Sequence, residues 1–508
     1  MDADVIVVGA GPAGLTLAAE LRLAGASVVL LERLAQRTGE SRGLGFTART
    51  MEVFDQRGLL PYFGTVETSA LGHFGGLPVD FGVIDGGDRA VKTIPQSETE
   101  SVLEQWAVGL GVDLRRSHDL LAVTDTGTHV EVDIAAPQGV IQLSAPYLVG
   151  CDGGRSTVRK AVGFDFPGTA STMEMFLADV KGLDLPPRMI GETLPNGMVM
   201  VGHLPGEITR LIVCERGAPP QRRESAPPYA EVAGAWQRIT GSDISHGEPV
   251  WISSFGNATR QATEYQRGRV FLAGDSAHIH LPAGGQGMNT SIQDSVNLGW
   301  KLGAVVTGRA PETLLSTYHD ERHPVGRRLL MNTQAQGLLF LTGSEMQPMR
   351  DLVAELIGYE QVARHLAGMV SGLEINYEVG GGSHPLLGYR LPDLGLTGPS
   401  APSSTTRALH PARGVLFDFE DNPRLRAVAA DWDDRIDIVT GRITRRPDSW
   451  PRDTAAVLVR PDGYIAWAAP GAYADLPMSL ERWFGHRHAD RTRIEHSHTL
   501  VPELLAQH

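Results

Sequence analysis

A glycine-rich turn between a strand and a helix restricts the fold of this chain more than any other feature of its sequence. Residues 4–8 form an apolar run typical of a buried strand, and residues 12–25 show helical spacing rich in small side chains. The sequence Gly9-Ala10-Gly11-Pro12-Ala13-Gly14 joins them. Such glycines allow a tight turn and let a pyrophosphate approach the helix N-terminus. We therefore predict a βαβ unit that binds a dinucleotide through Gly9, Gly11, Ala13 and Gly14.

An acidic residue closes the second expected strand of this unit. Glu32 ends the apolar run that begins at Ser27, about 20 residues beyond the glycines. A carboxylate at this position accepts hydrogen bonds from a ribose diol and repels a 2′-phosphate. Glu32 therefore favours an adenine dinucleotide without that phosphate, and Arg33 beside it is a further candidate contact. The turn alone does not separate FAD from NAD.

Length, charge and cysteine content limit the class of protein. The 508 residues correspond to about three domains of roughly 100–200 residues each. The net charge of −14 leaves no excess of basic side chains, so nucleic acid and anionic membranes are not expected partners. No apolar run approaches the roughly 20 residues of a membrane helix. With two cysteines, Cys151 and Cys214, and a strand where a leader peptide would stand, we expect a cytoplasmic protein.

Changes in composition divide the chain into three expected units of an α/β protein. Segments 1–70, 100–166 and 268–390 carry the βαβ pattern and a later run of helical periodicity, and we assign them to the dinucleotide-binding domain. Segments 71–99 and 167–267 contain short strands and form an expected inserted sheet domain that binds substrate. A Pro/Ser/Thr-rich linker precedes a third domain, residues 396–508.

Two later segments separate FAD from NAD. They read Cys151-Asp152-Gly153-Gly154-Arg155-Ser156-Thr157-Val158-Arg159 and Gly268-Arg269-Val270-Phe271-Leu272-Ala273-Gly274-Asp275-Ser276-Ala277-His278. Together with the glycine turn they resemble the ordered fingerprints of the flavoprotein aromatic hydroxylases, the single-component family related to para-hydroxybenzoate and phenol hydroxylases. The resemblance implies a Rossmann-type domain with FAD as cofactor. It also implies that NADPH or NADH docks transiently on the FAD domain, since no second glycine-rich strand–turn–helix unit occurs.

The resemblance implies roles for individual residues of these fingerprints. Asp275 would hydrogen-bond the flavin ribityl chain, and the alternative for it is a helix N-cap. Asp152 would contact FAD and the nicotinamide cofactor, with Arg155 and Arg159 supplying charge nearby. The alternative for that segment is a structural salt-bridge cluster.

Further residues match positions that hold FAD in relatives. Arg42, and Gln96 before a helix expected over residues 98–110, would hold the phosphates and the ribityl chain. A glycine-rich turn also opens the helix after the second fingerprint, so its free N–H groups would stabilise negative charge at the flavin N1–C2 carbonyl edge. The candidates there are Pro282, Gly287, Met288 and Asn289.

Within this family the sequence is most similar to the aromatic polyketide hydroxylases of the angucycline type, through residues 41–52 and 72–78. This implies an NAD(P)H-dependent monooxygenase of antibiotic biosynthesis that hydroxylates a polycyclic aromatic polyketide with O2 through a flavin C4a-hydroperoxide. It also implies a thioredoxin-like third domain. Residues 459–467 resemble the late hairpin of such a domain. The third domain lacks Cys-x-x-Cys, so we expect it to serve packing or an interface.

The substrate is expected between the FAD domain and the inserted sheet. Candidate contacts are His73, Phe74, Phe81, Met175, Phe176 and Met200, although each apolar one is individually more typical of core. No protein residue is assigned as catalytic, because the flavin carries the chemistry, and no general base is assigned. The pair His278 and His280 is not completed by a cluster of metal ligands, so no metal is expected.

Two alternatives stay open at this stage. A Baeyer–Villiger oxygenase of a polyketide ketone would use the same flavin chemistry, whereas a non-catalytic binding protein, like the Rab GDP-dissociation inhibitors, would share only the fold. The halogenase signature Trp-x-Trp-x-Ile-Pro is absent. The exact substrate and carbon, the number of oxygenations, the choice of NADH or NADPH and the oligomeric state, for which a homodimer is one option, are not determined by the sequence.

Overall fold

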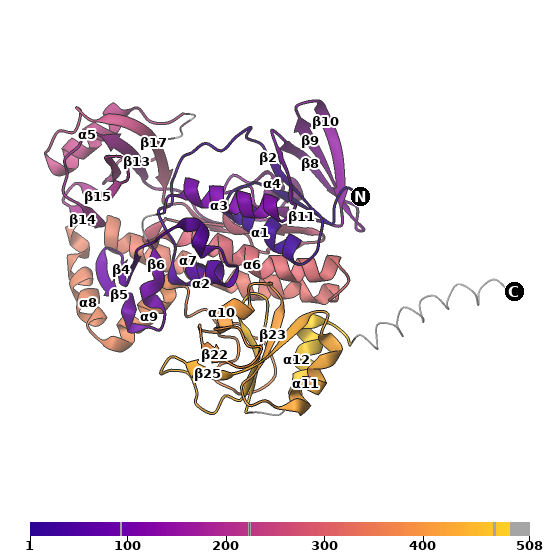
Figure 1. The fold of residues 1–508 in the computed structure, drawn as a ribbon. Helices are drawn as coiled ribbons and strands as arrows, with labels where there is room; N and C mark the ends of the chain where they lie inside the picture. The colour runs from indigo at the N-terminus through magenta and orange to yellow at the C-terminus, as the bar shows by residue number, and fades with distance from the viewer. Residues whose placement is uncertain (92–93, 222, 224, 471–473, 488–508) are drawn as a thin grey trace.

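A parallel sheet forms the centre of the computed structural model, which describes residues 1–487 except 92–93, 222, 224 and 471–473 (Figure 1). Residues 488–508 of the expected third domain thus lie outside the described residues. The sheet has the order β19-β20-β11-β1-β2-β7, and only β19 runs antiparallel to its neighbour. Its strands are β1 (Val5–Val8), β2 (Val28–Glu32), β7 (Asp113–Arg116), β11 (Tyr147–Gly150), β19 (Gln266–Arg267) and β20 (Val270–Leu272). The strands β1, β11 and β20 are buried throughout, as expected of a parallel sheet covered on both faces.

Helix α1 (Pro12–Leu23) packs lengthwise against α6 (Gln286–Val306), and glycines bring the two helices close together. A Cβ built on Gly299 would lie 2.5 Å from the Cβ of Glu20, and one on Gly303 would lie 2.3 Å from the Cβ of Ala24. The other helices of the domain are α2 (Ala48–Gln56), α3 (Gln96–Gly109), α4 (Thr157–Val162) and α7 (Ser316–Leu341). A side sheet of β8 (Asp119–Asp125), β9 (Val130–Ala136) and β10 (Gly139–Ala145) completes it.

Helix α3 begins earlier than the sequence pattern predicts. Gln96 is its first residue, whereas we expected it to precede a helix over 98–110. The extended backbone of Pro95 forms the N-cap, and its carbonyl accepts a bond from the Thr99 hydroxyl at 3.2 Å. Gln96 therefore sits in the first turn of α3.

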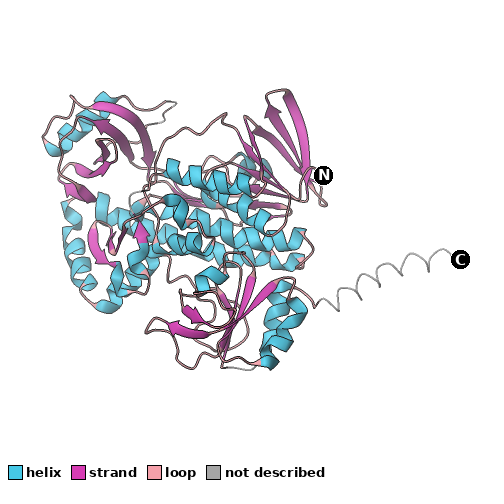
Figure 2. Cartoon of the chain, in the orientation of Figure 1, coloured by secondary structure: helices cyan, strands magenta, loops and turns pink. Residues whose placement is uncertain are grey.

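The inserted sheet lies beside this domain as a five-stranded antiparallel layer of order β14-β15-β16-β13-β17. Its strands are β13 (Glu174–Lys181), β14 (Arg188–Leu194), β15 (Gly197–Leu204), β16 (Ile208–Glu215) and β17 (Glu248–Gly256). Helix α5 (Tyr229–Thr240) covers the outer face of the sheet with the buried Trp236. The inner face meets the domain of the parallel sheet, where Met175 packs with Leu281 and Phe340. Figure 2 shows this layer apart from the central helices.

Residues 71–80 form a separate hairpin of β4 (Leu71–Phe74) and β5 (Leu77–Asp80). The hairpin contacts α8 (Gln347–Ile357) and α9 (Glu360–Ser371). The short strands that link the larger sheets are β3 (Thr68–Ser69), β6 (Ala90–Val91), β12 (Gly168–Thr169), β18 (Thr259–Gln261) and β21 (His278–Ile279).

The C-terminal domain contains a four-stranded sheet of order β24-β23-β26-β27. Its elements are β23 (Gly414–Asp418), β24 (Ile436–Thr440), β26 (Ala456–Val459), β27 (Ile465–Ala469), α11 (Pro423–Ala429) and α12 (Asp475–Phe484), with α10 (Thr405–Ala408), β22 (Gly395–Thr397) and β25 (Arg442–Arg445) beside them. The expected late hairpin is present as the antiparallel pair β26–β27. None of the helices in the described part of the chain is both long and apolar enough to cross a membrane.

Buried charges hold the C-terminal domain against α6 and α7. The Arg460 guanidinium donates to Glu321 at 2.5 and 2.9 Å and also to Asp462, and the Lys301 ammonium donates to Glu321 at 2.8 Å. The Arg460 guanidinium also lies 4.4 Å from the Trp483 ring centroid. Because each charge is paired, the interface avoids the cost of an isolated buried ion.

Candidate functional site

The glycine turn leaves open space at the N-terminus of α1. Gly9 has φ +101°, and a Cβ there would lie 2.5 Å from the Cys151 carbonyl oxygen; a Cβ on Gly14 would lie 1.8 Å from the Gly9 oxygen. These two glycines are thus required by the close approach of backbone segments. A Cβ built on Gly11 meets nothing within 4 Å. The space at Gly11, beside unpaired N–H groups of the helix, fits a pyrophosphate, and Ala13 lies buried in the same turn.

Glu32 braces this turn from the end of β2. One carboxylate oxygen accepts from the Ala10 N–H and the other from the Leu34 N–H, each at 2.9 Å. Each oxygen retains a lone pair for a ribose hydroxyl. Arg33 is exposed next to it.

Asp152 caps a helix and also has an atom without a partner. Its Oδ2 accepts from the N–H groups of Thr157 at 2.6 Å and Val158 at 3.1 Å, at the start of α4. Its Oδ1 is buried and has no hydrogen-bond partner among the described residues. A buried carboxylate oxygen without a donor is costly, so this atom fits a hydroxyl of the expected cofactor.

Arg159 joins the two fingerprints. Its guanidinium donates to the carbonyls of Ser276 at 2.9 Å and Gly154 at 2.8 Å and lies 3.9 Å from the Phe166 ring centroid. Burial lowers the pKa of Arg159, partly offset by the charge of Asp152. The Arg159 charge is therefore engaged by backbone carbonyls, whereas Arg155 is exposed.

Asp275 lies at the tip of the loop after β20, and a buried carboxylate supports that loop. The Asp275 side chain is accessible, yet the surrounding protein raises its pKa, against the opposing charges of His278 and Arg42. Beneath the loop, Asp294 on α6 accepts from the Gly274 N–H at 3.3 Å and pairs with His278 Nε2 at 2.8 Å. Asp294 is not among the residues predicted from the sequence.

Arg322 on α7 completes the support. Its Nε donates to Asp294 Oδ1 at 2.6 Å, and its other nitrogens donate to Tyr377 Oη at 2.8 Å and the Thr290 carbonyl at 3.3 Å. Burial alone would raise the pKa of Asp294, but the charge of Arg322 and the contact with His278 hold it below its usual value. Neither residue carries a local sequence signal, because charged residues are common on helices and only the fold brings Asp294 and Arg322 together.

The first turn of α6 brings further predicted residues together. The Asn289 side chain accepts from the Thr47 N–H at 2.8 Å and donates to the Gly285 carbonyl at 2.8 Å. The Gln96 Oε1 accepts from the Gly43 N–H at 3.2 Å, and a Cβ built on Gly43 would lie 3.3 Å from Met288 Cε. The side chain of Asn289 thus fixes the turn.

The backbone N–H groups of Gly287 and Met288 have no i−4 helical partner, because they lie in the first turn of α6, whereas Asn289 is the first residue whose i−4 carbonyl belongs to the N-cap, Gly285. A Cβ built on Gly285 meets nothing within 4 Å, so the space before the helix is open. Pro282 stands at the start of the preceding short turn. These features fit the electron-rich edge of a flavin.

Arg42 reaches toward the inserted sheet, since its Nη2 lies 3.5 Å from the Ser253 hydroxyl. Its charge also acts to lower the pKa of Asp275, so Arg42 lies between the Asp275 loop and the inner face of the sheet. This position suits contact with an anionic group in the crevice.

The predicted substrate contacts do not all face one space. Met175 and Met200 lie in an apolar cluster with Leu281 and Phe340, between the sheet and the FAD domain. Phe176 faces α5, because neighbouring residues of a strand point to opposite faces.

The aromatic residues of the β4–β5 hairpin have other neighbours. Phe74 and Phe81 pack in a core with Ala367 and Val370 of α9. The His73 ring centroid lies 6.4 Å from that of Phe340, at the edge of the cluster that contains Met175.

His280 lies close to the first turn of α6. Its Nδ1 lies 2.7 Å from the Leu281 carbonyl, and its Nε2 lies 3.3 Å from a Cβ built on Gly287. The surrounding protein, together with His278, lowers the pKa of His280 to about 4. No group of three His, Cys, Asp or Glu residues that could hold a metal occurs among the residues with described positions.

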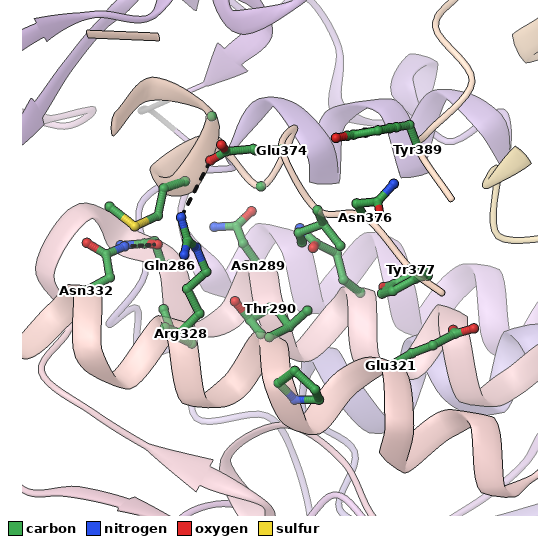
Figure 3. A pocket seen from close by; sticks show the side chains of 18 of the residues that line it. Gln286, Asn289, Thr290, Glu321, Arg328, Asn332, Glu374, Asn376, Tyr377 and Tyr389 are labelled. Carbon is green, nitrogen blue, oxygen red and sulfur yellow. Dashed lines mark hydrogen bonds and ion pairs between the residues drawn. The ribbon is translucent and has the colours of Figure 1, made fainter. Parts of the chain in front are cut away.

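A cavity of about 570 Å³ lies between α6, α7 and residues 368–378 (Figure 3). Gln286 and Asn289 contribute to its wall, and Asn332 donates to Gln286 at 2.9 Å. Arg328 and Glu374 approach to 3.9 Å at one side. The sequence did not predict this cavity. None of the residues of the three fingerprints lines this cavity, whereas Asn289, which was predicted to bind the cofactor, does.

Comparison with known proteins supports the family that the fingerprints indicate. Residues 2–333 match a family described as FAD binding domain, and residues 384–486 match one described as aromatic-ring hydroxylase, C-terminal. The anhydrotetracycline monooxygenase of Streptomyces rimosus is 41% identical over 498 residues, which cover 95% of this chain and 99% of that protein.

Two solved structures resemble the chain over nearly its whole length. CabE, an aromatic hydroxylase from angucycline biosynthesis, has a TM-score of 0.94 and 65% identity, covering 96% of this chain and 100% of that chain. BexE, studied for oxidation during BE-7585A biosynthesis, has a TM-score of 0.91 and 68% identity with the same coverage. The similarity therefore includes both the nucleotide crevice and the inserted sheet.

Proposed function

The chain belongs to the family of FAD-dependent aromatic-ring hydroxylases and is a flavin monooxygenase, and from this premise we propose that it hydroxylates a flat polycyclic polyketide of the angucycline type. The observation that carries the proposal is the 65% identity with CabE, which extends over 96% of the chain and so includes the sheet that faces the FAD domain. The family assignment sets aside the non-catalytic binding protein as an alternative.

The residues of the crevice fit FAD. Gly11 borders open space at a helix N-terminus, Asp152 Oδ1 is buried without a donor, and Asp275 extends from a supported loop. Glu32 would take the ribose. When bound, FAD would supply the redox chemistry of a monooxygenase, in which NAD(P)H provides two electrons, one oxygen atom of O2 enters the substrate ring and the other leaves as water.

The chain's own side chains would hold the reactants and keep water away. The first-turn N–H groups of α6 stabilise negative charge at the pyrimidine edge of the cofactor. The apolar cluster around Met175, Met200 and Phe340 forms an apolar wall near that turn, which would keep water away from the reacting ring. No side chain is required as a nucleophile. Burial and the neighbouring His278 lower the pKa of His280 to about 4, and we do not assign His280 as a general base.

The test is a single preparation with three measurements. We expect a yellow protein whose absorbance shows bound FAD, and whose oxidation of NADPH rises when a dihydroxylated tetracyclic angucyclinone is added. NADH is compared at the same concentration. Mass spectrometry of the product should show one added oxygen on an intact ring skeleton, with the label following ¹⁸O₂.

Other products would refute specific parts of the proposal. Ring opening to a lactone or acid would replace hydroxylation by Baeyer–Villiger chemistry. NADPH oxidation that yields only hydrogen peroxide with the angucyclinone, but hydroxylates a smaller phenol, would overturn the substrate class. A colourless protein that FAD cannot reconstitute would contradict the crevice described above.

A further inference from the structure

The inner face of the inserted sheet changes from apolar to charged with distance from the FAD domain. Strand register places its side chains in three cross-strand rows. The first row contains Met198, Cys214, Met175 and Phe255, the second contains Met200, Ile212, Leu177 and Ser253, and the third contains Gly202, Arg210, Asp179 and Trp251. The first row and part of the second pack against Leu281 and Phe340 of the FAD domain. The third row is therefore the far end of the same face.

The third row contains Arg210, whose guanidinium has one nitrogen without a hydrogen-bond acceptor among the described residues. Arg210 donates to the two oxygens of Asp179 through Nε and Nη2, each at 2.7 Å, and its side chain is only 4% exposed. Its remaining nitrogen, Nη1, is buried and has no acceptor within the described part of the chain. Because an N–H group buried without an acceptor is costly, Nη1 points to a partner from outside the chain.

The neighbours of Arg210 in the third row are a glycine and a partly exposed aromatic side chain. Gly202, directly across on β15, has no side chain, and a Cβ built there would meet only the Met189 side chain, at 3.4 Å or more. On the other side, the Trp251 ring centroid lies 5.9 Å from the Arg210 guanidinium, and Trp251 is partly exposed. An indole beside a cation is a surface on which an aromatic ring stacks.

We propose that Arg210 and Trp251 form a distal subsite for the oxygen-bearing end of a polycyclic aromatic ligand, an inference that rests on the proposed function. Nη1 donates to a carbonyl or phenolate oxygen, and Trp251 stacks on the terminal ring. Successive rows are two residues apart, so the third row lies roughly 14 Å from the first at about 3.4 Å per residue. That span suits four fused rings with the reacting ring at the flavin end, and it exceeds the length of two.

The test compares two ligands on FAD-loaded protein by equilibrium titration of the flavin absorbance. The ligands are a tetracyclic angucyclinone quinone and a two-ring hydroxynaphthoquinone. Arg210→Met should weaken binding of the tetracyclic quinone about 10- to 100-fold, as the loss of a charge-assisted hydrogen bond does, and leave the two-ring quinone within about threefold. Trp251→Ala should weaken the same ligand selectively.

Two further variants separate the subsite from folding. Arg210→Met leaves Asp179 buried and unpaired, whereas the double variant Asp179→Leu/Arg210→Met removes both charges and should restore stability. The double variant should still bind the tetracyclic quinone weakly. Arg223→Met is the matched control, because Arg223 pairs with Glu174 and lies 5.5 Å from the Phe176 ring on the opposite face of the sheet.

Each outcome decides between the ideas. Equal loss for both ligands, or recovery of tetracyclic binding in the double variant, would overturn the subsite and leave Arg210 a structural residue. Failure of the unmodified protein to bind or hydroxylate the tetracyclic quinone, with hydroxylation of another ligand, would instead overturn the proposed substrate class and the subsite with it.

Discussion

Asp294→Asn tests whether one buried carboxylate presents Asp275 to FAD. Oδ1 of Asp294 faces the Arg322 guanidinium, and Oδ2 faces both His278 Nε2 and the Gly274 N–H. The asparagine oxygen should turn toward Arg322, because a cation attracts it, and the amide NH2 then meets the Gly274 N–H. His278 can adapt by exchanging tautomer, since its Nδ1 is buried without a partner in the described chain. The Gly274 N–H cannot adapt and is left unsatisfied.

The magnitude follows from that one lost contact. The hydrogen bond from the Gly274 N–H to Asp294 is long, at 3.3 Å. Its loss should therefore cost about 1.5 kcal/mol, the low end of the range for hydrogen bonds to charged groups. If the loop moves, FAD binding weakens by about tenfold. The loss of the charge opposite Arg322 should also lower the free energy of unfolding of the apoprotein, by about 3–5 kcal/mol.

The assay measures FAD dissociation from reconstituted apoprotein by flavin fluorescence, beside the urea unfolding midpoint of the apoprotein. Glu20→Gln is the control, because Glu20 and Arg57 form an equally buried pair at 2.6 and 2.9 Å, away from the Asp275 loop. It should lower stability and leave FAD affinity unchanged. An Asp294→Asn protein that loses stability but binds FAD like the parent would refute the reasoning.

Gly11→Ala should keep the apoprotein melting temperature and bind FAD at least tenfold more weakly, because its Cβ enters the open crevice, whereas Gly9→Ala should not fold. The pKa of His280, lowered to about 4, is below the usual value of about 6.5, so the unfolded chain binds the extra proton first. The stability from neutral His280 is complete above about pH 6.5 and lost toward pH 4, and His280→Gln should flatten the fall in unfolding midpoint over that interval. Burial raises the pKa of Cys214 to about 11 and that of Cys151 well above its usual value, so a thiol reagent at pH 8 should label neither until the protein is unfolded.

The features whose positions in the fold follow from the sequence are those with a local cause. The glycine turn, the acid at the end of β2 and the aspartates after β11 and β20 lie at fixed offsets from strands and helices, so their positions follow once the strand is identified. Asp152 and Asn289 are instructive, because both also carry local structural bonds. For Asp152 the proposed cofactor contact and the helix cap therefore coexist, one on each carboxylate oxygen.

The features that the sequence did not predict depend on contacts between distant segments. Asp294 and Arg322 are 28 residues apart, and nothing local distinguishes them from the charged residues that normally face solvent on helices. The strand Glu174–Lys181 has apolar residues on both faces, so alternation shows that Met175 and Phe176 point apart but not which one faces the cofactor. The same ambiguity applies to Arg210, which in the sequence is a polar interruption of an apolar strand. Only the register with Asp179 and Gly202 shows that Arg210 lies in the third row of the inner face, where its Nη1 has no acceptor among the described residues.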